Sequence, residues 1–319
     1  MSSQFLTDKS LALEAAFYGF ALDTAPAFAE PGIAPHYAPD RPFHLASIDL
    51  HLTIDPLAGT LKGEAVLDIQ PQPFGLGDVV LDLDDMDVDS VELVDGTDLE
   101  FSEGDGKLHI QGIPNEGAQV RISWHGNPTR GLYFTGPTPA DKSRPHTAWS
   151  QCQDEDAHFF FPCIDHPSVK CSWTMRFTVP EGYQAIGNGR FDGREGNTWK
   201  WVQTEPMPSY LFTVCVGKFA IYEDEGARIP VRYLAPEGVD DATLKRVFGK
   251  TPAMINFFEK RYGHPYAWAR YDQVVVHDFI FGGMENVAAT TLTDLVLTDE
   301  RAALDWDAES LIAHELAHQ

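Results

Sequence analysis

The stretch IDLHLTIDPLAGTLKGEAVLDI, residues Ile48 to Ile69, decides the fold class of this chain. Apolar or small residues occupy every second position on each side of a turn at Pro56–Gly59, and mostly polar residues lie between them. A period of two puts successive side chains on opposite faces of a β-strand. The stretch therefore predicts a β-hairpin with one buried face.

Similar short runs follow the hairpin and are separated by Gly and Pro turn residues. We expect strands at Val79–Leu83, Ser90–Val94, Leu108–Ile110, Val120–Trp124, Trp173–Val179, Trp199–Gln203 and Tyr210–Gly217. They predict a mostly β domain over residues 44–219, after an N-terminal extension, residues 1–43, with a short helix at Ser10–Phe20. The acidic residues between positions 82 and 89 fit a solvated strand face and turn better than a calcium site, which stays an alternative.

The pattern changes after residue 219. Apolar residues at helical spacing predict a helix over Asp240–Tyr262, which Pro252 kinks or splits and Gly263 ends. A strand is expected at Tyr271–Val276, and a final helix at Asp307–Gln319 with Asp305 or Asp307 as its N-cap. Residues 220–319 therefore read as a second region of mixed helix and strand.

Composition narrows the class of protein. The chain has 319 residues, 43% of them hydrophobic, and a formal net charge of -25, which disfavours nucleic acid and anionic membrane surfaces as partners. The start carries no secretory signal pattern and no apolar run is long enough to span a bilayer, so a cytoplasmic protein is expected. The four cysteines match no C-x-x-C pair, which predicts buried free thiols.

The last helix carries the first chemical motif, H-E-x-x-H, formed by His314, Glu315 and His318. A four-residue spacing puts both imidazoles on one helix face, where they can converge on a metal ion. Zn²⁺ suits two neutral imidazoles and a carboxylate, and Glu315 is then placed to act as general base toward a water molecule. The motif alone also occurs by chance in helices without a metal.

A second motif lies about thirty residues upstream, where Gly282, Gly283, Met284 and Glu285 precede an Asn. Two glycines let an extended backbone approach a ligand closely, and an exposed sheet edge can bind a peptide as an added strand. Glu285 then supplies an anion for a free α-amino group. In isolation the stretch also fits an ordinary strand and turn with a solvated Glu.

The two motifs together resemble the gluzincin aminopeptidases, a family of alanyl and leucyl aminopeptidases and leukotriene hydrolases with a G-x-M-E-N motif before the zinc motif. The resemblance implies a saddle-like, mostly β N-terminal sandwich domain followed by the start of an α/β, thermolysin-like zinc-peptidase domain. It also implies site roles. His314 and His318 bind Zn²⁺, Glu315 is the catalytic base, and the substrate is held by Gly282, Gly283, Met284 and Glu285.

A third stretch agrees with this family. Residues 151–153 and 161–170 resemble its β-domain signature, in which the position of Gln153 helps to hold the substrate amine. The alternative for Gln153 is a structural amide. An Arg usual in the signature is replaced here by His158. Asp165 is expected to be structural rather than catalytic.

Two family elements are missing from this sequence. The resembled family takes its third zinc ligand from a Glu about nineteen residues after the second His, and a later Tyr stabilises the tetrahedral intermediate. The sequence ends at Gln319 and holds neither. Two His ligands alone bind zinc weakly, so we expect this chain to be inactive or nearly so, as a piece of a longer product.

Three functions remain open at this point. The leading one is a zinc aminopeptidase that hydrolyses the N-terminal residue of peptides with a free N-terminus, using metal-activated water and a Glu base. The second is a bifunctional epoxide hydrolase and aminopeptidase, toward which Gly283 and Gln153 point. The third is a noncatalytic peptide-binding module.

Overall fold

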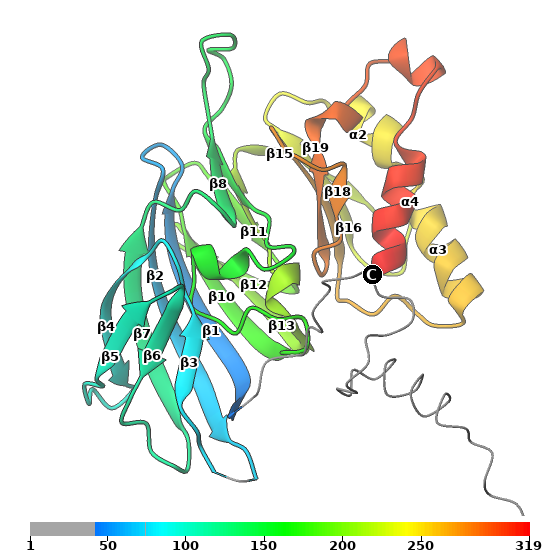
Figure 1. Ribbon diagram of the computed structural model, residues 1–319. Coiled ribbons are helices and arrows are strands. Elements are labelled where there is room, and N and C mark those ends of the chain that lie inside the picture. Colours follow the sequence, from blue (N-terminus) through cyan, green and yellow to red (C-terminus); the bar gives the residue numbers. More distant parts are fainter. Residues whose placement is uncertain (1–41, 74) are drawn as a thin grey trace, which may run out of the picture. The chain divides into compact units, whose positions relative to one another are not determined.

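A computed structural model describes residues 42–73 and 75–319, all within one of two compact units, residues 41–319 (Figure 1). The helix expected at Ser10–Phe20 falls outside the described residues. Described residues form four sheets, of seven, four, five and three strands.

The seven-stranded sheet has the predicted hairpin at its centre. Its strands are β1 (Phe43–Asp55), β2 (Thr60–Pro71), β4 (Asp87–Leu93), β7 (Ala118–Gly126), β10 (Cys171–Thr178), β12 (Arg190–Glu195) and β13 (Thr198–Met207), in the order β12-β13-β10-β1-β2-β7-β4. Strands β1 and β2 are antiparallel, with Ile48 opposite Leu67. Leu50 and Leu52 are fully buried on one face, which confirms the alternation as the source of the fold.

Two smaller sheets complete the β-rich part. The four-stranded sheet runs β11 (Gln184–Gly187), β14 (Val214–Gly217), β9 (Thr147–Ser150) and β8 (Leu132–Thr135), and the three-stranded one β3 (Val79–Asp82), β6 (Lys107–Ile110) and β5 (Phe101–Gly104). The strand predicted from Tyr210 is wrong at its start, because residues 209–211 form a 3₁₀ turn, η2 (Ser209–Leu211). The Asn188 side chain bonds the carbonyl of Leu211 and the N–H of Thr213, so a side chain replaces strand pairing there.

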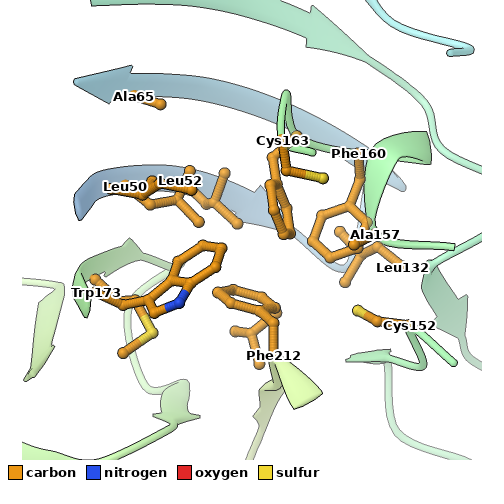
Figure 2. Packing of buried hydrophobic residues seen from close by; sticks show 14 of the residues in the cluster. Leu50, Leu52, Ala65, Leu132, Cys152, Ala157, Phe160, Cys163, Trp173 and Phe212 are labelled. Atoms are coloured by element: carbon orange, nitrogen blue, oxygen red, sulfur yellow. The ribbon is translucent and has the colours of Figure 1, made fainter. Parts of the chain in front are cut away.

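One large cluster of buried side chains, which we call the first core, fills the β-rich part. Figure 2 shows the neighbouring rings of Trp173 and Phe212 in one cluster with Leu50, Leu52 and Phe160. Phe160 belongs to a segment that begins with the 3₁₀ turn η1 (Ala157–Phe159), and its carbonyl accepts a hydrogen bond from the Trp124 indole at 2.9 Å. All four cysteines are free and buried, as predicted.

The five-stranded sheet belongs to the C-terminal region. Its order is β15 (Phe219–Asp224), β16 (Val231–Pro236), β17 (Tyr271–Val276), β19 (Ala289–Thr293) and β18 (Gly283–Met284). Strands β16, β17 and β19 are parallel, whereas β15 and β18 join as antiparallel edge strands. The remaining elements are helices α2 (Asp241–Phe248), α3 (Thr251–Tyr262) and α4 (Glu309–His318) and turns η3 (Asp294–Val296) and η4 (Ala302–Leu304).

The helices pack on this sheet around a separate cluster, the second core, which includes Leu244, Phe248, Ile255, Ile312 and Leu316. The helix predicted over Asp240–Tyr262 is split, with Pro252 in the first turn of α3. Gly263 ends α3 at φ 69°, as predicted. No helix in the described part of the chain is both long and apolar enough to cross a bilayer.

The start of α4 corrects the predicted cap. The N-cap residue is Ala308 rather than Asp305 or Asp307. Asp307 still contributes, because its carboxylate accepts a hydrogen bond from the Glu309 N–H at 3.0 Å. Ala308 has φ -97° and ψ 9°, so the backbone turns one residue later than a side-chain cap at Asp307 requires.

Candidate active site

Helix α4 brings the two histidines of the H-E-x-x-H motif together. The Nε2 atoms of His314 and His318 lie 3.1 Å apart, and their rings meet edge to face with centroids 4.8 Å apart. Both side chains are exposed, while Ile312 and Leu316 on the same helix are buried in the second core. The helix therefore fixes two imidazoles on its open face through contacts on its other face.

This donor pair fits a zinc ion. Two nitrogens each about 2.0–2.1 Å from zinc are separated by about 3.3 Å in a tetrahedral site, close to the 3.1 Å observed between the histidines. Among residues 42–73 and 75–319, no group of three or more His, Cys, Asp or Glu side chains is arranged to hold a metal. The described residues thus offer two of the protein ligands that a zinc site needs.

Glu315 lies on the buried side of α4, with 4% of its surface exposed. Burial, followed by the nearby charge of Glu285, raises the pKa of Glu315 to about 7. The Glu315 side chain rests directly against the Gly283 backbone: a Cβ at Gly283 would lie 2.6 Å from its Cγ, Cδ and Oε1 atoms. Only glycine leaves that space, which gives the second motif a steric reason for its residue type.

Strand β18 holds the middle of the second motif. Met284 is buried in the first core, and Glu285 directly after it is half-buried. Gly282 lies over helix α4, since a Cβ there would be 3.1 Å from Leu311 Cδ1. The carboxylates of Glu285 and Glu315 are close enough for one charge to affect the other, so the structure brings the two motifs together.

The third stretch holds two glutamines in different environments, one buried and one exposed. Gln151 is 2% exposed, and its amide Nε2 donates to Met284 Sδ at 3.4 Å. Gln153, the predicted amine ligand, is exposed in the turn after β9. Gln151 follows a fully buried strand, β9, and this position at a strand end is the sequence signal that could have identified it.

A buried polar cluster anchors the segment that carries both glutamines. Asp165 accepts hydrogen bonds from the Ser209 hydroxyl at 2.6 Å and from the His158 ring at 2.9 Å. Burial of the ring opposes protonation, but the hydrogen bond to Asp165 and the charges of Asp165, Asp82 and Asp84 together raise the pKa of His158. The predicted structural role of Asp165 agrees with these contacts.

Comparison with known proteins identifies the family. The family model described as "Peptidase M1 N-terminal domain" matches residues 35–211, and the one described as "Peptidase family M1 domain" matches residues 247–319. Aminopeptidase B of Rattus norvegicus is 33% identical over 181 residues, 56% of this chain and 26% of that protein. Leukotriene A-4 hydrolase of Xenopus laevis is 26% identical over 306 residues, 88% of this chain and 48% of that protein.

Solved structures agree on the fold. Native yeast LTA4 hydrolase matches 91% of this chain and 46% of its own with a TM-score of 0.74 and 22% identity. This likeness confirms the expected β-rich N-terminal sandwich and the start of the catalytic domain. The chain spans between about a quarter and a half of the length of these relatives. By the match of its N-terminal half and of its C-terminal residues to the two models, the chain belongs to peptidase family M1.

Proposed function

We propose that the protein is a zinc-dependent aminopeptidase that removes the N-terminal residue from peptides with a free N-terminus. One observation carries the proposal: α4 sets two imidazole nitrogens 3.1 Å apart, and the neighbouring Glu315 packs on the strand that leads to Glu285. A metal-binding pair, a general base and an anion for an ammonium group therefore converge in one place.

His314 and His318 are the proposed ligands of the zinc ion, and a third ligand comes from outside the described residues. Zinc in such a site acts as a Lewis acid that polarises a carbonyl and acidifies water. Glu315 accepts the proton of the attacking water and passes it to the leaving amine. Glu315 directly follows His314 and lies three residues before His318, and its side chain rests against the Gly283 backbone.

Substrate orientation is assigned to the second motif. Strand β18 is the edge of the five-stranded sheet, and an edge strand can bind an extended peptide by main-chain hydrogen bonds. Gly282, Gly283 and Met284 line that position, and Glu285 pairs with the substrate ammonium group. Gln153, exposed in the turn after β9, is the proposed second ligand of the amine.

The test compares ligands with free and blocked amines. The zinc-loaded protein, in a form that also carries the third metal ligand, is assayed with a leucine anilide and with its N-acetyl derivative, and only the first is expected to be hydrolysed at an appreciable rate. Replacing Glu285 with Ala removes the counter-charge and lowers kcat/KM for the free-amine substrate by about 10² or more. Equal hydrolysis of both substrates by the unmodified protein would refute the exopeptidase assignment.

A second activity is favoured by one specific comparison. The match to leukotriene A-4 hydrolase extends over 88% of the chain, further than the match to aminopeptidase B. We therefore include epoxide hydrolysis as a second candidate at the same site. An assay of the zinc-loaded protein with a fatty-acid epoxide beside the peptide substrate separates the two. If only the peptide is consumed, the epoxide hydrolase activity is excluded and the aminopeptidase activity is retained.

A further inference from the structure

The connection between β18 and β19, residues 285–288, has no strand partner, so its backbone groups need other hydrogen bonds. Asn188 donates to the carbonyl of Val287 at 3.0 Å. Arg270 donates to the carbonyl of Ala288 at 3.1 Å. The backbone N–H groups of Asp272 and Ala289 also donate to the carbonyls of Ala288 and Asn286, at 2.9 and 3.0 Å. The remaining side-chain hydrogen bonds to this backbone come from Gln319 at the end of α4.

Gln319 makes four hydrogen bonds with its amide group. Its Nε2 donates to the carbonyls of Glu285 at 2.9 Å and Asn286 at 3.2 Å. Its Oε1 accepts from the N–H of Ala288 at 3.0 Å and from the hydroxyl of Tyr266 at 3.2 Å. Only this orientation of the amide satisfies all four groups, because a flipped amide would face two carbonyls with its own oxygen.

These bonds act on a strained segment. Ala288 has φ +63°, a left-handed conformation that costs an L-residue about 1 kcal/mol or more. The N–H of Ala288 is the group that Gln319 Oε1 holds. The carbonyl of Glu285, at the other end of the segment, is held by Gln319 Nε2. One side chain therefore bridges both ends of the connection.

We propose that Gln319 is a positioning residue that fixes the Glu285 carboxylate relative to the metal-binding histidines and so determines selectivity for a free N-terminus. The proposal deepens the proposed aminopeptidase function and rests on it. Gln319 directly follows His318, so the same helix end that carries a metal ligand also carries the amide that holds the Glu285 backbone. The spacing between the metal and the ammonium group of the substrate is set through this bridge.

The Gln319 bridge suits this role because it sets the distance between the metal-binding histidines and Glu285, which a substrate has to match. An aminopeptidase has to place the ammonium group and the scissile carbonyl of the same N-terminal residue at once, and errors of about 1 Å in such placement cost up to 10²-fold in rate. Glu285 itself is only half-buried, and its backbone carbonyl and the next one are both held by Gln319. Loss of the amide frees the Glu285 backbone without removing its charge.

Two variants test the proposal. Gln319→Met keeps the length of the side chain and removes all four hydrogen bonds, whereas Gln319→Glu keeps an acceptor for Ala288 and turns the donor half into an oxygen that repels two carbonyls. Gln203→Met is the matched control: Gln203 is 1% exposed, donates to the Glu205 carbonyl at 2.9 Å, and lies in β13 of the seven-stranded sheet. Glu285→Ala is the reference for complete loss of the amine anchor.

The measured quantity is a ratio of affinities. Leucine hydroxamate and N-acetyl-leucine hydroxamate both offer the same metal-binding group, so the ratio of their inhibition constants isolates recognition of the amine. Zinc affinity is measured separately by competition with a chelator. We expect both Gln319 variants to reduce the free-amine preference by about tenfold, with zinc affinity changed less than threefold and Gln203→Met leaving the ratio unchanged.

Two results would overturn the inference. If the Gln319 variants keep the ratio of the unmodified protein while Glu285→Ala loses it, Gln319 has no positioning role and the proposed function stands. If the unmodified protein itself shows no preference for the free amine, both the proposed function and this inference fail. A fall in the ratio with Gln203→Met of the same size would assign the effect to general destabilisation and also reject the inference.

Discussion

The two halves of the candidate site rest on different cores. Met284 and Val287, which flank Glu285, are buried in the first core together with the strands of the β-rich part. Ile312 and Leu316, which hold α4, are buried in the second core together with α2 and α3. The amine-binding segment and the metal-binding helix thus pack in different cores, although strands of the five-stranded sheet contribute side chains to both.

Besides the approach of Gly282 to Leu311, two contacts join these halves at the site. Gly283 meets Glu315 with no room for a Cβ, and Gln319 bonds the Glu285 and Asn286 carbonyls. The first is a steric stop and the second a set of directional bonds, so together they fix both distance and orientation. Experiments that change each core and each contact in turn can show whether this division is real.

The largest expected effect concerns the chemistry on the helix side. Glu315→Gln keeps the shape of the side chain and removes the base, so kcat is expected to fall by about 10²–10⁴-fold. Zinc content, measured by atomic absorption, is expected to be unchanged, and so is the preference for a free amine in hydroxamate binding. Retained turnover in Glu315→Gln would rule out the general-base assignment.

The next effect tests whether the first core is a separate unit. Phe212 is fully buried and its ring lies near those of Phe160, Phe161, Trp173 and Phe177. Phe212→Ala is expected to reduce the free energy of unfolding by about 3–5 kcal/mol. The surface-exposed Phe191 provides the control, since 38% of it is already accessible and Phe191→Ala should cost much less.

Two spectroscopic probes can show which core is destabilised by Phe212→Ala. Five of the seven tryptophans lie in residues 44–219, whereas the described α-helices lie in residues 241–318. Tryptophan fluorescence therefore reports mainly on the first core and ellipticity at 222 nm on the second. We expect the urea midpoint to fall further by fluorescence than by ellipticity. Coincident shifts would mean that both cores unfold as one cooperative unit.

A smaller effect is expected where the two halves meet. Gly283→Ala places a methyl group within 2.6 Å of the Glu315 carboxyl group, so the base has to move and kcat/KM is expected to fall by about 10- to 100-fold. Gly282→Ala meets only Leu311 Cδ1, at 3.1 Å, and should cost less. Equal activity of the two variants would show that the steric stop does not position Glu315.

The sequence predicted the parts of this site that depend on local periodicity. A four-residue spacing on a helix is sufficient to bring His314 and His318 together, and strict alternation was sufficient for the β1–β2 hairpin. The bridge by Gln319 joins residues more than thirty positions apart, and no periodicity encodes which backbone groups a side chain will find. The same limit applies to Gln151, whose contact with Met284 the sequence did not predict. The amine-binding role of Gln153 stays a prediction.

Errors at element ends have a related cause. Ala308 occupies the N-cap position of α4 although Asp305 and Asp307 are better capping residues, and Asp307 instead accepts a hydrogen bond from the Glu309 N–H. The predicted domain boundary between residues 219 and 220, which stays a prediction, lies after the first residue of β15, a strand that pairs with β16 of the five-stranded sheet. Local sequence pattern was sufficient to predict whether these elements are helices or strands. It was not sufficient to predict the residue at which each one begins.

The smallest expected effect is the contribution of the His158 charge to the free energy of unfolding. His158 faces Asp165, with which it bonds, and the carboxylates of Asp82 and Asp84, and together these raise its pKa despite burial. A group whose pKa is higher in the folded state adds stability that is complete below its unfolded pKa, near 6.5. That stability is lost as the pH rises through the folded pKa, so the contribution of His158 should decline above neutral pH.

Two variants measure this contribution: His158→Gln removes the charge, and His158→Arg makes it permanent. The difference in unfolding free energy between the unmodified protein and His158→Gln should be on the order of 1 kcal/mol at pH 5.5 and should shrink toward pH 8.5. His158→Arg keeps its charge throughout, so its advantage over His158→Gln should stay constant over the same range. Because the cluster anchors the segment of Gln151 in the first core, the change should appear in tryptophan fluorescence before it appears in helix ellipticity. A pH dependence of equal size in both probes would place the effect in the whole unit and remove the distinction between the two cores.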